Sequence, residues 1–325
     1  MTPFTSAGSV PDWQDFKQLP NPQIAERVQA STLGSVLVAI DGTQRWFLFD
    51  HLEGKRDAIS SAHYWSTYMK VTSRQYTVLL RMIFEHGVTT VFEPLYLSRP
   101  PGEFERALIN LPRIVSDQAF VDLYHELDVQ VHFYGSWQPL LTRLGHTYLW
   151  ERLRALEEDT ASHQQRRLYW GLHTPETNPE TEAIGHALAV GTRSTQELIE
   201  SYYGQDVPPV SLAVLHAEQP WPATYLPPFV GQRAIFYFTA NSPLAMSVQQ
   251  WREILYDYLY CRRTDAEFRN YTQLDANTWD GLKQFYNLNR ESTLGVGRRH
   301  PQGEFWYPLP QIKLPERWCD NDQPG

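Results

Sequence analysis

The most informative stretch of this chain is Ser35-Val-Leu-Val-Ala-Ile-Asp-Gly-Thr-Gln-Arg-Trp-Phe47. Its apolar, β-branched start ends abruptly in Asp41-Gly42-Thr43, which is typical of a buried parallel strand that carries a carboxylate to the carboxyl end of a sheet. Open α/β sheets bind ligands at that edge. Gly42 permits a tight turn and Arg45 follows closely, so the stretch predicts an anion-binding pocket with an acid able to hold a metal. The alternative is a strand that only ends in a turn.

Length and composition exclude several classes of protein. The 325 residues suit one large α/β domain, and the net charge of -9 argues against a nucleic-acid partner, since such proteins concentrate Lys and Arg. Two cysteines, Cys261 and Cys319, are too few for a disulfide framework. The sequence shows neither a signal peptide nor an apolar span of about 18 residues, which predicts a cytoplasmic protein without an integral membrane segment.

Aromatic residues are unusually frequent, at 14% of the chain with 11 Trp and 18 Tyr. Most such residues pack cores and interfaces. Aromatic walls also suit a pocket that stabilises positive charge, because ring faces attract cations.

Apolar strand patterns alternate with amphipathic helix patterns along the chain. This order predicts an α/β fold with a mostly parallel six-stranded sheet flanked by helices on both faces. We expect the strands near residues 35–40, 88–92, 129–134, 167–172, 211–215 and 234–239.

The pattern also predicts the organisation around the sheet. We expect an irregular N-terminal arm over residues 1–20, a single catalytic domain over 21–307 and a C-terminal tail over 308–325, with the tail from Tyr271 onward irregular. Several local features are expected as well: a strand end near Phe92 set by Pro94, helices over 65–83 and 140–158, and a capping box between Ser194 and Glu197.

Asp41-Gly-Thr43 resembles the end of the Asp-x-Asp-Gly-Thr signature of haloacid dehalogenase phosphatases. The nucleophilic Asp of that signature would fall on Ala39, which excludes an aspartyl-phosphate nucleophile. The longer stretch Asp41-Gly-Thr-Gln-Arg-Trp46 resembles the Asp-Gly-Asn-Gly-Arg-Trp motif of the cis-prenyltransferases, the undecaprenyl diphosphate synthase family.

The cis-prenyltransferase resemblance implies that family's fold and a diphosphate site. It implies that Asp41 is a catalytic residue serving Mg²⁺ and the diphosphate, which Gly42, Thr43, Gln44 and Arg45 would bind. The family places Arg-Thr-Ser-Gly-Glu-x-Arg-Leu-Ser after its fifth strand to hold isopentenyl diphosphate. Residues 215–224 contain no Arg, so we expect one diphosphate site and no chain elongation.

A further set of short motifs is similar to the tuberculosinol synthase group of diterpene synthases, which are built on the same fold. The matches occur in order over about residues 35–306. They are Ile40-Asp-Gly-Thr-Gln-Arg-Trp-Phe47, Phe84-Glu-His-Gly87, Phe133-Tyr-Gly135, Tyr202-Tyr-Gly204, Tyr237-Phe-Thr239, Ile254-Leu-Tyr-Asp257 and Gly295-Val-Gly297.

That group converts bicyclic diterpenyl diphosphates of the kolavenyl or tuberculosinyl type into alcohols. The resemblance implies a homodimeric enzyme that ionises such a substrate and adds water, giving a diterpene alcohol and pyrophosphate. It implies that Tyr68 is the catalytic tyrosine and that Arg74, with Gln75, contacts the diphosphate. Periodicity alone favours Tyr68 as a residue that packs a helix face, and only the resemblance reverses this interpretation. Arg74 lies off the apolar stripe and could be solvated or salt-bridged instead.

The loop after the second strand supplies weaker candidates. Arg99 is a candidate diphosphate ligand, because it follows that strand at the binding edge. Glu103 and Glu105 are candidate metal ligands, since they stand where the family carries acidic residues. The histidines at 51, 63, 132 and 300 form no metal-spaced cluster.

Two other functions stay open. The chain could be a prenyltransferase that condenses two prenyl diphosphates in a cis or head-to-middle reaction, which would require a second prenyl diphosphate. It could also be a non-catalytic partner of a cis-prenyltransferase. Such partners generally lose the first-strand Asp motif, which is intact here at Asp41.

Overall fold

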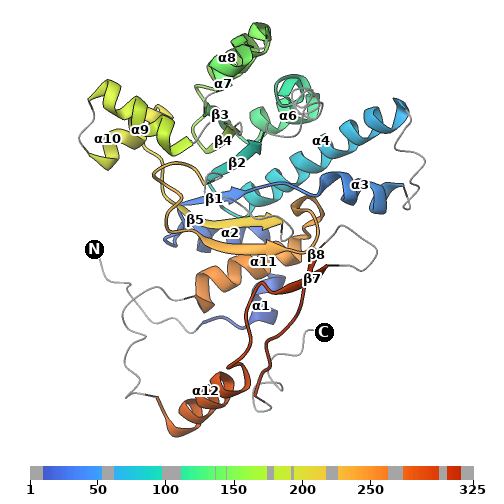
Figure 1. Ribbon diagram of the computed structural model, residues 1–325, viewed down its shortest axis with the longest axis vertical. Helices are drawn as coiled ribbons and strands as arrows, with labels where there is room; N and C mark the ends of the chain where they lie inside the picture. The colour runs from blue at the N-terminus through green and yellow to red at the C-terminus, as the bar shows by residue number, and fades with distance from the viewer. Residues whose placement is uncertain are drawn as a thin grey trace. The chain divides into compact units, whose positions relative to one another are not determined.

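A computed structural model of the protein describes ten stretches of the chain (Figure 1). The chain forms two compact units, Met1–Leu259 and Tyr260–Gly325, and each is described separately. The described stretches are residues 10–52, 62–96, 111–135, 137–143, 145–173, 179–191, 194–216, 226–262, 274–299 and 306–315.

The first unit is built on a six-stranded sheet in the order β3-β4-β2-β1-β5-β6, in which every pair is parallel. This arrangement confirms the predicted fold class. The strands are β1 Ser35–Val38, β2 Thr90–Tyr96, β3 Val129–Tyr134, β4 Arg166–His173, β5 Val210–His216 and β6 Ile235–Thr239.

Helices surround this sheet, and a helical turn also covers residues 111–116. The labelled helices of the first unit are α1 Trp13–Gln18, α2 Asn21–Gln29, α3 Thr43–His51, α4 Ala62–Glu85, α6 Gln118–Glu126, α7 Trp137–Arg143, α8 Thr147–Asp159, α9 Pro179–Val190, α10 Thr195–Tyr203 and α11 Val248–Tyr256, with a 3-10 turn η3 Pro243–Ala245. A π-helical turn, η4 Asp257–Cys261, continues α11.

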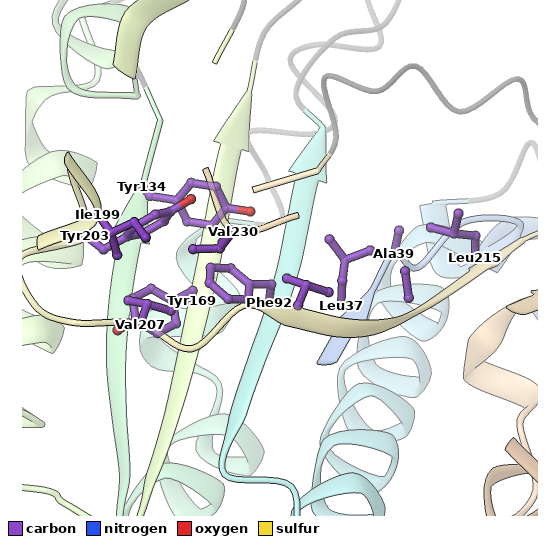
Figure 2. Close-up of a cluster of buried hydrophobic side chains, with 12 residues drawn as sticks. Leu37, Ala39, Phe92, Tyr134, Tyr169, Ile199, Tyr203, Val207, Leu215 and Val230 are labelled. Atoms are coloured by element: carbon purple, nitrogen blue, oxygen red, sulfur yellow. The ribbon is translucent and has the colours of Figure 1, made fainter. Parts of the chain in front are cut away.

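The two faces of the sheet carry different layers, because successive strand residues point to opposite sides. On one face, Phe92 of β2 packs in a buried cluster with Tyr203 of α10 and with Leu37 and Ala39 (Figure 2). On the other face, the neighbouring residue Glu93 meets Tyr76 of α4. Helices therefore cover both faces, as the alternating pattern predicts.

Pro94 does not end the second strand, contrary to the prediction. The strand β2 pairs with β1 up to Phe92 and continues beside β4 to Tyr96. Pro94 is tolerated because it lies beyond the last β1–β2 pair, where the strand β1 has already ended.

Two other expectations also differ from the structure, and a third is confirmed. The helix expected over 140–158 is two helices, α7 and α8, separated around Gly145, whose φ of 76° is left-handed. The N-terminal arm is not irregular throughout, because it contains α1. The predicted capping box is confirmed, since Ser194 and Glu197 bond each other's backbone N–H groups.

The second unit has regular structure where the sequence predicts an irregular tail. It contains the helix α12 Ala276–Leu288 and the antiparallel pair β7 Gly297–Arg299 and β8 Trp306–Pro308. Asp275 caps α12 by accepting from the Thr278 N–H and hydroxyl, each at 2.9 Å. No helix within the described stretches is both long and apolar enough to cross a membrane.

The N-terminal helices belong to the core of the first unit. Phe16 of α1 is fully buried, with its ring centroid 5.4 Å from that of Tyr256 on α11. Arg252 of α11 donates to the Lys17 carbonyl at 2.6 Å and to Asn21 Oδ1 at 2.7 Å. Apolar packing and hydrogen bonds together attach the start of the chain to the unit.

This packing predicts that Phe16→Ala destabilises the protein by about 3–5 kcal/mol, because it leaves a cavity in a closed core. The matched control is Phe49→Ala on α3, whose side chain is 69% exposed and whose loss should cost only about 0.5 kcal/mol. Urea unfolding followed by tryptophan fluorescence measures both. Equal stabilities of the two variants would contradict a core role for α1.

Candidate active site

The candidate site lies at the carboxyl ends of β1 and β5. These strands are neighbours, but the chain continues from β1 toward β2 and from β5 toward β6, on opposite sides. Such a switch point leaves a crevice at the carboxyl edge of a parallel sheet, and ligands bind there. Asp41 and Gly42 follow β1, and His216 is the last residue of β5. Asp41 and His216 therefore lie on the two sides of this switch point.

The turn after β1 leads into α3, and the first backbone amides of that helix are of the kind that bind anions. Gly42 adopts φ 67° and ψ 11°, a left-handed conformation that glycine adopts without strain, and its N–H donates to Asp41 Oδ1 at 2.7 Å. The first helical bond runs from the Trp46 N–H to the Gly42 carbonyl at 3.0 Å. The amides of the three residues between them precede the helical ladder, and such amides bind phosphate oxygens.

Tyr68 of α4 reaches this turn directly. Its hydroxyl lies 2.7 Å from Thr43 Oγ1, within hydrogen-bonding distance. Its ring packs edge-on against Phe47 at 5.4 Å and Trp65 at 5.8 Å, and stacks with Tyr64 at 6.1 Å. The structure therefore brings a tyrosine hydroxyl and four aromatic rings to the turn that carries Asp41.

His216 is a site residue that the sequence interpretation missed. It is buried, and a Cβ placed on Gly42 would lie 3.2 Å from His216 Nε2. Burial lowers the pKa of His216; the Asp41 charge opposes this shift and the Arg45 charge adds to it. The signal that could have identified His216 is its position, because it is a polar residue at the end of the strand next to β1. The sequence interpretation considered this segment only for its lack of arginines.

A second polar group lies on the α4 face of the sheet. The Glu93 carboxyl accepts the Ile40 N–H and the Tyr76 hydroxyl, the latter at 3.3 Å from Oε1. Burial raises the pKa of Glu93 well above its usual range, and these two hydrogen bonds oppose the shift. Because Ile40 directly precedes Asp41, Glu93 holds the backbone that leads into the turn.

Arg113 is another cation that sequence reasoning did not single out. It donates to Thr72 Oγ1 at 3.3 Å and to the Ser73 hydroxyl on the buried side of α4. Burial lowers its pKa, while Asp117, Tyr68 and Tyr76 oppose that shift. Its charge therefore faces the hydroxyls of α4.

The other predicted residues lie in different places. Gln44 and Arg45 are both exposed on α3. Gln44 lies close enough to influence the Tyr64 hydroxyl, and Arg45 lies close enough to influence His216. Arg74 is exposed and lies about 120° around α4 from Tyr68, since each residue advances a helix by about 100°. Gln75 donates to the Leu244 carbonyl at 2.8 Å. Arg99, Glu103 and Glu105 lie outside the described residues.

Comparison with known proteins gives two distant relatives and several similar structures, while no family model matches the chain. The tuberculosinyl adenosine transferase of Mycobacterium tuberculosis (strain CDC 1551 / Oshkosh) is 26% identical over 300 residues, covering 88% of this chain and 95% of that protein. The (+)-kolavelool synthase of Herpetosiphon aurantiacus is 23% identical over 252 residues, covering 74% and 80%.

Two solved structures share the architecture. A probable undecaprenyl diphosphate synthase from Campylobacter jejuni matches with a TM-score of 0.50 and 16% identity, over 71% of this chain and 98% of that one. Lavandulyl diphosphate synthase from Lavandula x intermedia matches with a TM-score of 0.53 and 14% identity, over 71% and 97%. The chain has the cis-prenyltransferase fold.

Two of the short motifs are joined by a hydrogen bond in this fold. The Tyr237 hydroxyl of β6 donates to Asp257 Oδ2 at 2.7 Å. Thr43, in the first motif, lies within hydrogen-bonding distance of Tyr68, the tyrosine that the family resemblance identifies.

A Mg²⁺ ion fits the residues present at the turn. No group of three His, Cys, Asp or Glu side chains able to hold a metal occurs in the described part of the chain. Mg²⁺ in phosphate sites is commonly held by one or two carboxylates plus the phosphates themselves. Asp41, beside the free end of α3, can supply one such carboxylate.

Gly42→Ala should weaken binding of inorganic pyrophosphate in the presence of Mg²⁺. The new methyl group would press on His216 and strain a left-handed residue, at a cost of about 1–2 kcal/mol. Gly204→Ala is the matched control, because Gly204 also has a positive φ, 77°, but its Cβ would meet nothing within 4 Å. Calorimetric titration should show weaker binding for Gly42→Ala alone, and equal affinities would contradict the assignment.

Proposed function

We propose that this protein is a diterpene synthase that ionises a bicyclic diterpenyl diphosphate of the kolavenyl or tuberculosinyl type and adds water. The products are a diterpene alcohol and pyrophosphate, and kolavelool synthase is the individual activity that we would test first. Distant homology to the two relatives supports a prenyl diphosphate substrate.

The observation that carries this proposal is the bond between Thr43 and Tyr68. Thr43 opens the helix whose amides suit a diphosphate, and Tyr68 stands in a group of aromatic rings. This hydrogen bond therefore links the proposed diphosphate site at the start of α3 with the aromatic group that would surround the carbocation. A diphosphate on α3 and a hydrocarbon against these rings fit a single substrate.

The residues of the turn would stabilise the departing diphosphate. The helix fixes the backbone amides at the start of α3 before the reaction, which is the arrangement that lowers the barrier to charge separation. The exposed Arg45 guanidinium would add positive charge beside them. Mg²⁺ held by Asp41 would neutralise charge on the leaving group when it is bound.

The aromatic group would stabilise the cation that remains. Phe47, Tyr64, Trp65 and Tyr68 present ring faces and edges within a small volume, and ring faces attract positive charge. The Tyr68 hydroxyl, within hydrogen-bonding distance of Thr43, would orient the attacking water.

Purified protein incubated with kolavenyl or tuberculosinyl diphosphate and Mg²⁺ should release pyrophosphate and give a terpene alcohol detectable by gas chromatography and mass spectrometry. Asp41→Ala should lower the rate about 10²–10³-fold, because the leaving group loses an electrostatic partner. Product formation that needs isopentenyl diphosphate would instead indicate a prenyltransferase. Absence of pyrophosphate with both substrates would overturn the proposal.

Tyr68→Phe should lower turnover about tenfold or more, since it removes one positioned hydroxyl and leaves the ring in place. Tyr124→Phe is the control, because the Tyr124 hydroxyl also donates a hydrogen bond, to the Ile114 carbonyl at 3.0 Å, but lies away from the turn. Initial rates of pyrophosphate release compare the two. If Tyr68→Phe turns over as fast as the wild-type protein, Tyr68 has only a packing role.

A second candidate is transfer of the diterpenyl group to a nucleoside. It is favoured by the wider coverage of the tuberculosinyl adenosine transferase, 88% of this chain against 74% for kolavelool synthase. The same assay with added adenosine separates the two activities. A nucleoside adduct formed at the expense of the alcohol would favour transfer.

A further inference from the structure

Glu93 has one carboxylate oxygen without a partner in the described part of the chain. The residue is 1% exposed, so water outside the protein does not reach it. Its carboxyl accepts the Ile40 N–H and the Tyr76 hydroxyl, but Oε2 receives no hydrogen bond. A buried carboxylate oxygen left in this state is costly, so an ordered water or a ligand group is the usual explanation.

Glu93 contacts both the turn after β1 and the helix α4, which together form the proposed site. Its carboxyl accepts the N–H of Ile40, the residue before Asp41. Through Tyr76 it touches α4, on which Tyr68, Thr72 and Tyr76 follow at four-residue spacing and so share one side of the helix. Water bound at Oε2 would thus lie between the sheet and the helix side that carries Tyr68.

We propose that Glu93 Oε2 binds the water that attacks the diterpenyl cation and accepts its proton. This inference rests on the proposed function. A lone pair of the water oxygen forms the new C–O bond, one O–H bond of the resulting oxonium breaks, and its proton moves to Oε2. The protonated carboxyl later passes that proton to solvent or to the released pyrophosphate.

Glu93 suits this step better than its neighbours. A phenol such as that of Tyr68 is a weak proton acceptor, and Asp41 Oδ1 already accepts the Gly42 N–H beside the proposed diphosphate. Burial raises the pKa of Glu93, so its ionised form takes up a proton more readily than an ordinary carboxylate does.

Glu93→Gln is the decisive variant, because the amide still offers an oxygen to Ile40 and Tyr76 but cannot take up the proton. The wild-type enzyme should give mainly alcohol. The variant should still release pyrophosphate, but its ratio of alcohol to alkene should fall about tenfold or more, since a cation without its water loses a proton from carbon instead.

Glu157→Gln is the matched control. Glu157 is a half-buried glutamate whose pKa burial also raises, and it accepts a backbone N–H, that of Phe133 at 2.8 Å. It lies on α8 beside β3, away from the turn, so its variant should keep the wild-type product ratio. A changed ratio in both variants would indicate a general effect of removing a buried charge and would overturn the role of Glu93.

The remaining outcomes separate the two proposals. If wild-type protein makes alcohol and Glu93→Gln keeps its product ratio, the Glu93 inference is wrong and the proposed function stands. If wild-type protein releases no pyrophosphate, both are wrong. A high-resolution crystal structure gives a readout without turnover: we expect an ordered water on Oε2, and a protein group bonded there would overturn the inference.

Discussion

The left-handed turn at Gly42 is the constraint on which the site depends. The strand β1 stops at Val38, earlier than its neighbours β2 and β5, and the chain must turn at once into α3. A side chain at Gly42 would be strained by φ 67° and would meet His216. The absence of a Cβ therefore lets the start of α3, Asp41 and the end of β5 lie close together. Tyr68 then fixes the helix by its bond to Thr43.

The sequence predicts the sheet well because its strands are buried on both faces. Near-continuous apolar runs such as residues 35–40 and 211–215 have few other interpretations between helices. The capping box at Ser194 is equally local and is confirmed. The expected strand end at Pro94 and the single helix expected over 140–158 were wrong for a common reason. A proline is tolerated in a strand where the neighbouring strand has ended. A glycine ends a helix only when tertiary packing turns the chain. Neither condition can be recognised from the residues next to it in the sequence.

The sequence likewise predicts only part of the candidate site. Asp41 and Gly42 could be predicted because one short segment contains both the strand end and the turn. Tyr68 was identified by family resemblance, since helical periodicity alone makes it one aromatic among several, and its bond to Thr43 is seen only in the structure. His216 and Glu93 escaped notice because their importance comes from neighbours on other strands. A histidine that ends a strand and a glutamate inside one become informative only when the strand order is known.

The polarity of the α4 face bears on the choice between a synthase and a chain-elongating enzyme. A long polyprenyl chain needs a continuous apolar lining, because each buried polar group that it covers loses its hydration. Here the layer between α4 and the sheet contains the hydroxyls of Thr72, Ser73 and Tyr76, the Glu93 carboxyl and the Arg113 guanidinium, several of them bonded to one another. A layer of this polarity agrees better with the proposed synthase than with a chain-elongating enzyme. The arginine-free segment that follows β5 at His216 agrees with this argument, since a second diphosphate would require cations there.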